Sequence, residues 1–306
     1  MNWLRATKGF FLSFIFLLIF VYLMSGTKSL FEGSLLTSAS ISEAVANIGN
    51  SIQNEQPAKV IQISPPAINA EAAISRISNL SDKNTILFEK DSNLKLPIAS
   101  LTKLMTAVVI LDNYNLESIT IVSKQADLQN SINQDVGVGT KLSVESFLEI
   151  MLIKSSNKSA YALAEIMGEQ KFVDAMNKKA KDLGLNDTFF ADPTGLSSNN
   201  VSTAKDISNL AEYILKNYSK IAKISRSKEL NIPGFGKIAN TDQLLEEMPD
   251  AVFSKTGFTN DAKGCLLLVV NNQDSKDYLI NVILGADDRF SEMRKLINWS
   301  SDAYSK

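Results

Sequence analysis

Residues 265–285 read CLLLVVNNQDSKDYLINVILG, and this stretch decides the fold. Two runs rich in Leu, Ile and Val, 265–271 and 278–285, lie on either side of the polar residues 272–275. β-Prone runs separated by a short polar segment are typical of a β-hairpin. The stretch therefore predicts two adjacent antiparallel strands near the end of the chain.

Further strands are expected on both sides of a helical middle. Residues 251–256 form a third β-prone run, and residues 72–79 and 85–90 predict another hairpin. Apolar residues at helical spacing predict helices at 100–113, 144–154, 158–169, 171–183, 203–219 and 289–304. Strands at both ends with helices between them indicate an α+β fold. We expect one antiparallel sheet covered by helices, with its first and last segments paired and a helical cluster inserted between them.

The composition excludes several classes of protein. The 306-residue chain carries 31 basic and 33 acidic side chains, so it has no basic excess for a nucleic-acid partner. It has no histidine, which excludes a Ser-His-Asp triad, a Cys-His pair and a His-ligated metal site. The single cysteine, Cys265, excludes an intrachain disulfide and a thiolate zinc cluster, and its apolar neighbours predict a core position. A catalytic base would therefore have to be Lys, Asp, Glu or Tyr.

The N-terminal segment predicts a membrane anchor. Residues 9–27 carry no charge and would form a helix of roughly 28 Å, close to the hydrocarbon thickness of a bilayer. The basic residues of 1–8 predict a cytoplasmic tail, so the rest of the chain should be extracytoplasmic on a single-pass anchor in the cell membrane. Residues 28–70 predict a linker and residues 71–306 a folded domain. A cleaved secretory signal is the alternative, although the first small-residue pattern, 38–40, lies far from the apolar core.

One candidate reactive pair is Ser100 and Lys103, in the pattern Ser-x-x-Lys. This pattern occurs six times in the chain, so alone it is not specific. Ser100, however, opens the most apolar helix of the folded part, where free backbone N–H groups lie near the helix end. Lys103 lies one turn later on the same face, and a desolvated lysine has a lowered pKa and can act as a base. The alternative is a serine that caps the helix, followed by a solvated lysine.

Two other segments could add to such a site. Ser155 and Asn157 lie in a Ser-x-Asn sequence between two predicted helices, and a turn there can present a hydroxyl and an amide to a cleft. Lys255, Thr256 and Gly257 form the one Lys-Thr-Gly sequence of the chain, on a predicted strand. Gly257 would let a ligand backbone approach closely, and the lysine and hydroxyl could hold a carboxylate. The alternatives are a helix-connecting turn and an edge-strand lysine beside a bulge glycine.

The order Ser-x-x-Lys, Ser-x-Asn, Lys-Thr-Gly resembles that of the active-site serine penicillin-recognising enzymes. The surrounding sequence resembles the D-alanyl-D-alanine carboxypeptidase family in particular. The similar segments are LPIASLTKLMTAVVIL (96–111), FLEIMLIKSSNKSAYALAE (147–165), DPTGLSSNNVSTAKDISNLAEYIL (192–215), SKTGFTNDAKGCLLLVV (254–270) and DRFSEMRKLINW (288–299). The resemblance implies a β-lactamase/DD-peptidase-like fold, with residues 71–306 as its catalytic domain.

The resemblance also implies an activity and residue roles. The protein would remove the terminal D-alanine from peptidoglycan stem pentapeptides through an acyl-enzyme, and β-lactam antibiotics would acylate it as covalent inhibitors. The implied catalytic residues are Ser100 as nucleophile, Lys103 as its base and Ser155 as a proton relay. Asn157 would orient the substrate or Lys103, Lys255 and Thr256 beside Gly257 would bind the terminal carboxylate, and the N–H groups of Ser100 and Phe258 would form the oxyanion hole. No metal or cofactor is implied, and activity should rise as a lysine loses its proton.

Three other functions are open. A β-lactamase would share the first steps, but Leu230-Asn231 has Ser227 where a class A enzyme has the glutamate of its Glu-x-x-Leu-Asn loop. A D,D-endopeptidase that cleaves cross-links would use the same residues. The third is an inactive, membrane-anchored cell-wall-binding protein, against which the presence of all three motifs counts.

Overall fold

The computed structural model describes residues 64–80, 84–130, 136–272 and 277–303. The chain divides into two compact units, Met1–Pro57 and Ala58–Lys306, and every described residue belongs to the second. The predicted tail, the anchor at 9–27 and most of the linker therefore lie outside the described residues. Within the ranges that are described, no helix is long and apolar enough to cross a membrane. The domain boundary at residue 71 stays a prediction.

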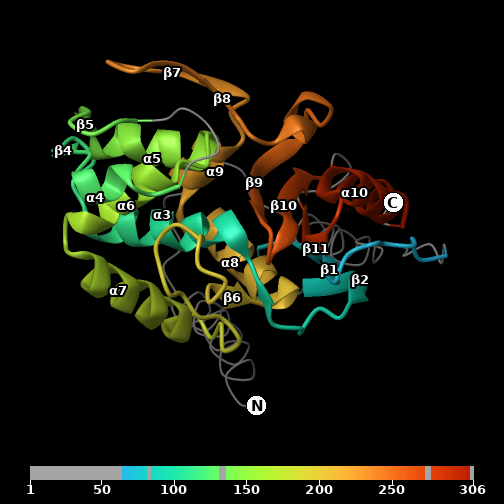
Figure 1. The fold of residues 1–306 in the computed structure, drawn as a ribbon. Helices are drawn as coiled ribbons and strands as arrows, with labels where there is room; N and C mark the ends of the chain where they lie inside the picture. The colour runs from blue at the N-terminus through green and yellow to red at the C-terminus, as the bar shows by residue number, and fades with distance from the viewer. Residues whose placement is uncertain (1–63, 81–83, 131–135, 273–276, 304–306) are drawn as a thin grey trace, which may run out of the picture. The chain divides into compact units, whose positions relative to one another are not determined.

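The second unit contains a five-stranded antiparallel sheet in the order β2-β1-β11-β10-β9 (Figure 1). Its strands are β1 (Ala72–Ser78), β2 (Asn84–Lys90), β9 (Ala251–Thr259), β10 (Lys263–Asn271) and β11 (Tyr278–Ala286). β1 pairs with β11, with Ala72 opposite Leu284 and Ser78 opposite Tyr278. The predicted pairing of the first and last sheet segments and the hairpin of 265–285 are thus confirmed.

Both faces of the sheet are buried, which explains the continuous apolar run of β10. Leu266, Leu268 and Val270 pack in one hydrophobic cluster with Met293 and Leu296 of α10 (Arg289–Ala303). The intervening side chains, including Leu267 and Val269, belong to a larger cluster that contains the other helices. Since successive side chains of a strand point to opposite faces, a strand covered on both sides needs apolar residues at every position. Cys265 is fully buried in the larger cluster, as predicted.

The helical cluster is inserted between β2 and β9 and covers the sheet face opposite α10 (Figure 1). Its helices are α3 (Thr102–Asn113), α4 (Lys124–Asp127), α5 (Val144–Ile153), α6 (Asn157–Glu165), α7 (Glu169–Asp182), α8 (Ala204–Asn217) and α9 (Ser219–Ser225). α3 is buried from Thr102 to Ile110 because α5, α6, α7 and α8 all pack against it. Side-chain caps begin the flanking helices: Ser143 caps α5, Ser156 caps α6 and Thr203 caps α8. The α+β class with an inserted helical cluster is confirmed.

Several element boundaries differ from the prediction. The helix expected from residue 100 begins with a 3-10 turn, η1 (Ala99–Leu101), so Ser100 precedes α3 instead of lying in its first turn. The helix expected at 158–169 ends at Glu165, and Gly168, at φ +90°, is the N-cap of the next helix, α7. β9 continues to Thr259, which places the whole Lys-Thr-Gly sequence within the strand. The 3-10 helix η2 (Gln243–Glu246) precedes this strand.

Sequence patterns also missed six short strands, which form three two-stranded pairs. These are β3 (Leu96–Pro97) with β6 (Val201–Ser202), β4 (Ile119–Ile121) with β5 (Lys141–Ser143), and β7 (Glu229–Ile232) with β8 (Gly236–Ala239). Strands of two to four residues are too short to show a period-2 pattern, so only their pairing partners identify them.

Two glycines allow other segments to pack directly on the turn that carries Ser100. A Cβ on Gly195, which has φ +86°, would lie 2.0 Å from the carbonyl oxygen of Ala99. A Cβ on Gly257 of β9 would lie 3.0 Å from the backbone nitrogen of Ser100. A real Cβ essentially never approaches backbone as closely as at position 195, which therefore requires glycine. At position 257 a Cβ would be tightly crowded, so glycine there lets the strand lie directly against the backbone of Ser100. These contacts bring the loop around Gly195 and the edge strand β9 against the serine turn.

Gly195→Ala is expected to destabilise the fold more than Gly139→Ala. Both positions have a positive φ, which costs an alanine about 1 kcal/mol, but nothing lies within 4 Å of the Cβ position of Gly139. The clash with Ala99 should add about 1–3 kcal/mol to the loss of unfolding free energy for Gly195→Ala. Denaturant unfolding of both variants measures this difference. Equal losses would show that the close packing of Gly195 is unimportant.

Candidate active site

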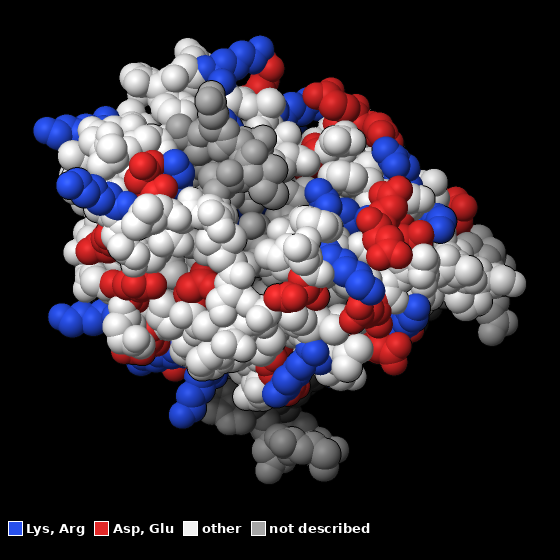
Figure 2. Space-filling model, viewed as in Figure 1, with Lys and Arg blue, Asp and Glu red and all other residues white. Residues whose placement is uncertain are grey.

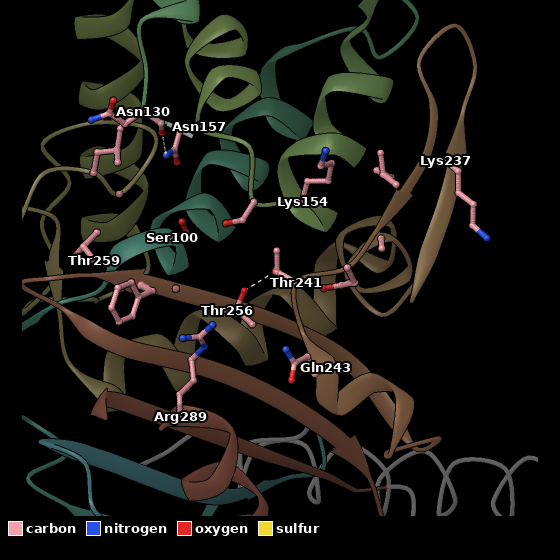
Figure 3. Close-up of a pocket in the computed structure, with 18 residues that line it drawn as sticks. Ser100, Asn130, Lys154, Asn157, Lys237, Thr241, Gln243, Thr256, Thr259 and Arg289 are labelled. Carbon is pink, nitrogen blue, oxygen red and sulfur yellow. Dashed lines mark hydrogen bonds between the residues drawn. The ribbon is translucent and has the colours of Figure 1, made fainter. Parts of the chain in front are cut away.

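A cleft of about 920 Å³ lies between the edge strand β9 and the helical cluster (Figure 3). Six of the eight predicted site residues line it: Ser100, Ser155, Asn157, Thr256, Gly257 and Phe258. The other two, Lys103 and Lys255, are buried, with 0% and 2% of their surface exposed, and their amines contact cleft residues. The structure therefore brings together all the residues that the three motifs predicted.

The Lys103 amine connects three segments of the chain. Its Nζ lies 3.0 Å from Ser100 Oγ, 2.6 Å from Asn157 Oδ1 and 2.5 Å from the carbonyl oxygen of Thr194. These acceptors come from η1, α6 and the loop before β6. An ammonium has three N–H donors, so the charged form can use all three contacts. When Lys103 is neutral, its lone pair can accept a hydrogen bond from the Ser100 hydroxyl at the same distance.

Lys255 and Ser155 form a second lysine–serine pair. Lys255 Nζ donates to Ser155 Oγ at 2.9 Å and to the carbonyl oxygen of Thr256 at 3.1 Å. Ser155 has a φ of +59°, a strained conformation for a residue with a side chain. Burial, together with the positive charge of Arg289, lowers the pKa of Lys255 to about 7, although Asp242 acts in the opposite direction. This amine is thus able to gain or lose a proton near neutral pH.

Asn157 is held from both ends of its amide. Its Oδ1 accepts from Lys103, and its Nδ2 donates to the backbone oxygen of Asn130 at 2.5 Å (Figure 3). Asn130 also lines the cleft. The neighbouring Lys158 forms an ion pair of 2.7 Å with Asp127 of α4, three residues before Asn130. These contacts fix the amide orientation that presents its oxygen to Lys103.

The loop that supplies Thr194 was not identified from the sequence as part of the site. Asp192 organises it: its carboxylate accepts from the backbone N–H groups of Thr194 at 2.6 Å, Gly195 at 2.8 Å and Ser197 at 2.8 Å. Burial alone would raise the pKa of Asp192, but these hydrogen bonds and that of the Thr194 hydroxyl lower it below its ordinary value. The Asp-Pro-Thr-Gly sequence is a turn pattern that could have indicated such a loop, but not its contact with Lys103.

Arg289 is a second residue that the sequence did not identify. It is the first residue of α10, lines the cleft and extends toward Thr256 (Figure 3). Its Nε is buried and has no hydrogen-bond partner among the described residues. A Cβ on Gly264 would lie 3.0 Å from the Cβ of Arg289, so glycine at this position gives the arginine room. Burial lowers the pKa of Arg289, and the nearby Cys265, Asp242 and Asp288 oppose this shift.

The charges that line the cleft have one sign. Lys154, Lys237 and Arg289 line it, whereas no aspartate or glutamate does so among the described residues. On the molecular face drawn in Figure 2, by contrast, basic and acidic side chains are interspersed. The cleft thus favours an anionic ligand over a cationic one. Lys237, on the β7–β8 hairpin, points away from Ser100 and pairs with Glu229 at 2.7 Å (Figure 3).

A match to the family model of D-alanyl-D-alanine carboxypeptidase extends over residues 59–288. The chain belongs to this family. A D-alanyl-D-alanine endopeptidase of Pseudomonas aeruginosa is 32% identical over 72% of this chain and 75% of its own length. The D-alanyl-D-alanine carboxypeptidase DacF of Bacillus subtilis is 30% identical over 77% of this chain and 64% of its own.

Solved structures of the family share the fold. The crystal structure of a D-alanyl-D-alanine carboxypeptidase from Mycobacterium tuberculosis superposes with a TM-score of 0.69, at 28% identity, over 81% of this chain and 96% of that one. The family consists of serine hydrolases, and the β-lactamase/DD-peptidase-like fold predicted from the sequence is confirmed.

Lys255→Met should change the pH dependence of stability. Because the folded-state pKa of Lys255 is about 7, the unfolded wild-type chain binds this proton between about pH 7 and 10 whereas the folded protein does not. The unfolding free energy of the wild type should therefore rise with pH in this window relative to the variant, on the order of 1 kcal/mol per pH unit.

Denaturant unfolding at pH 7, 8 and 9.5 measures this difference. Lys237→Met is the matched control, because it removes an exposed lysine of the same cleft. A stability difference between the wild type and Lys255→Met that stays constant from pH 7 to 9.5 would contradict the lowered pKa.

Proposed function

We propose that this protein is a serine-type D-Ala-D-Ala carboxypeptidase that removes the terminal D-alanine of peptidoglycan stem pentapeptides. The observation that carries the proposal is the pair of lysine–serine contacts in one cleft: Lys103 with Ser100 at 3.0 Å and Lys255 with Ser155 at 2.9 Å. An acyl transfer needs a nucleophile with a base and a donor for the leaving group. Family membership supports assigning these two tasks to the two pairs.

Ser100 is the proposed nucleophile. Neutral Lys103 takes the proton of the hydroxyl while Oγ attacks the carbonyl carbon of the last peptide bond. The negative charge on the carbonyl oxygen is then stabilised by the backbone N–H groups of Ser100 and Phe258. Gly257 of β9 lies against the serine turn, with its Cβ position 3.0 Å from the backbone nitrogen of Ser100, which supports this arrangement of donors.

The Lys255–Ser155 pair is proposed to protonate the leaving group. The Ser155 hydroxyl passes a proton to the nitrogen of the departing D-alanine, and Lys255 replaces it through their hydrogen bond. Water then attacks the acyl-enzyme and releases the shortened peptide. No residue of this sequence requires a metal or cofactor for these steps.

The terminal carboxylate of the substrate is proposed to bind at Lys255, Thr256 and Arg289. The unsatisfied Nε of Arg289 and the absence of acidic lining residues among the described ones support this position. Thr256 is held in place by Thr241, with 2.6 Å between their hydroxyl oxygens (Figure 3). A β-lactam antibiotic carries a carboxylate at a similar distance from its reactive carbonyl and would acylate Ser100 in the same way.

Endopeptidase activity on cross-linked peptides is the second candidate. Three of the similar curated proteins, from Pseudomonas aeruginosa, Escherichia coli and Haemophilus influenzae, are named D-alanyl-D-alanine endopeptidases and are 32–37% identical to this chain. The same catalytic steps can cleave the last peptide bond of a stem pentapeptide or the bond of a cross-link. The two activities therefore differ only in the group that follows the scissile bond. Release of D-alanine from a pentapeptide, compared with cleavage of a cross-linked dimer, distinguishes them.

Ser100→Ala is expected to abolish D-alanine release from a stem pentapeptide, with a loss of at least about 10³-fold in rate. The control is Ser225→Ala, which changes the serine of another Ser-x-x-Lys pattern whose buried Oγ has no partner among the described residues and which does not line the cleft. It should retain wild-type activity. Retained activity in Ser100→Ala would overturn the assignment, and fast β-lactam turnover without D-alanine release would instead favour a β-lactamase.

We also propose that residues 9–27 anchor the protein in the cell membrane with the catalytic domain outside. Support comes from the uncharged sequence of this segment and the basic residues before it. Leu17→Arg combined with Leu18→Arg should move the full chain from the membrane fraction to the supernatant, because each arginine at a helix centre costs about 3 kcal/mol of insertion free energy. Leu17→Ile with Leu18→Ile is the control. Membrane sedimentation of the arginine variant after a carbonate wash would argue against the anchor.

A further inference from the structure

Thr241, in the segment between β8 and η2, connects the two sides of the cleft. Its backbone N–H donates to the carbonyl oxygen of Ile153, the last residue of α5, at 3.1 Å. Its hydroxyl oxygen lies 2.6 Å from that of Thr256 in β9 (Figure 3). Ile153 lies two residues before Ser155. Thr241 therefore joins the turn that carries the proposed proton donor to the strand that carries the proposed carboxylate site.

The residues on both sides of Thr241 are held in place. The side-chain amide of Asn240 donates to the carbonyl oxygen of Ser225 at 2.9 Å. Asp242 is buried, and its carboxylate accepts from the hydroxyl of Ser254 in β9. Because both neighbours and its own backbone N–H are bonded, Thr241 has little freedom to move away from its partner in the strand.

The hydroxyls of Thr241 and Thr256 share one hydrogen bond, which can run in either direction. A hydroxyl has one proton to donate and two lone pairs that accept. Among the residues that the structure describes, neither hydroxyl has another hydrogen-bond partner. If Thr256 donates to Thr241, it has only lone pairs left for a ligand. If Thr241 donates instead, the proton of Thr256 is available to the ligand.

An anionic ligand selects the second direction. The proposed ligand of Thr256 is a carboxylate, which accepts hydrogen bonds and cannot donate them. The lone pairs of Thr256 would repel it, whereas the proton would form a charge-assisted hydrogen bond. A hydrogen bond from Thr241 also polarises the Thr256 hydroxyl, which strengthens the next bond of the chain. The hydroxyl of Thr241 thus has a task that a methyl group could not perform.

We propose that Thr241 is a positioning residue that donates its hydroxyl proton to Thr256, so that Thr256 donates its own proton to the terminal carboxylate of the substrate. The proposal rests on the proposed function, since it takes this carboxylate as the ligand. Thr241 acts through Thr256 and not on the reacting atoms. The consequence is specificity: the chain of hydroxyls favours a C-terminal carboxylate over a C-terminal amide, which is uncharged and forms a weaker bond with the same proton.

The test compares the binding of N-acetyl-D-alanyl-D-alanine with that of its C-terminal amide. The full chain, in mild detergent, carries Ser100→Ala so that neither probe is consumed. NMR titration of ¹³C-labelled threonine methyl groups gives both dissociation constants. Adding Thr241→Val removes the hydroxyl and keeps the branched shape. It should weaken binding of the carboxylate probe by about five- to tenfold and binding of the amide by less than about twofold.

Two further variants serve as controls in the same Ser100→Ala background. Thr241→Ser keeps the hydroxyl and should restore both dissociation constants. Thr140→Val is the matched control, because the Thr140 hydroxyl also takes part in one hydrogen bond, accepting from the backbone N–H of Gly137 at 3.2 Å, but does not line the cleft. It should bind both probes like the parent. If Thr241→Val does not fold, Thr241→Ala takes its place.

Equal weakening of both probes by Thr241→Val would overturn the proposal and leave Thr241 a purely structural link. Unchanged binding of the carboxylate probe, or a parent protein that does not prefer this probe to the amide, would overturn it as well.

Failure of the proposed function gives a different result. D-alanine release from a stem pentapeptide is measured with Ser100 intact. No release, together with carboxylate binding that depends on the Thr241 hydroxyl, would refute the proposed function alone. Release by the wild type, together with probe binding that is insensitive to Thr241→Val, would refute the role of Thr241 alone.

Discussion

The buried amine of Lys103 is the group on which the arrangement of the site depends. An amine without water needs partners, and it finds them on Ser100, Asn157 and the carbonyl oxygen of Thr194. These three residues belong to separate segments, so satisfying one amine brings η1, α6 and the 192–197 loop to the same point. Glycine at position 195 makes this possible, since any side chain there would collide with Ala99. The stability of this part of the fold and the proposed reactivity of Ser100 thus rely on the same contacts.

Much of the fold could be predicted from periodicity because its main elements are long. The apolar run of β10 and the nine-residue strand β11 gave the hairpin, and the pairing of β1 with β11 followed from strands at both ends of a helical middle. Elements of two to four residues, such as β7 and β8, escaped because their stability comes from partners far along the chain. Ser100 was expected within a helix, but it lies in a 3-10 turn whose first residue, Ala99, has a positive φ that sequence propensity does not indicate.

The candidate site was predictable to the extent that its residues occur in short motifs. Ser100 with Lys103, Ser155 with Asn157, and Lys255 through Phe258 are adjacent in sequence, and the structure places them around one cleft. Asp192 and Arg289 lie outside those motifs, and no local pattern marks them as part of the site. Their contacts depend on two glycines, on the register of β9 and on the start of α10, which are properties of the folded chain. The absence of histidine also bears on the proposed reaction. With no imidazole in the chain, its proton transfers fall to two buried lysines, of which Lys255 has a pKa of about 7.

The most direct test of a histidine-free serine enzyme is to locate the covalent adduct. The full chain is incubated with a penicillin, digested with trypsin and analysed by mass spectrometry. Cleavage after Lys95 and Lys103 yields the peptide 96–103, which contains Ser100 and no other serine. The account predicts that this peptide carries the mass of one opened penicillin on Ser100. An unmodified 96–103 peptide, or an adduct on Ser155 or any other residue, would contradict it.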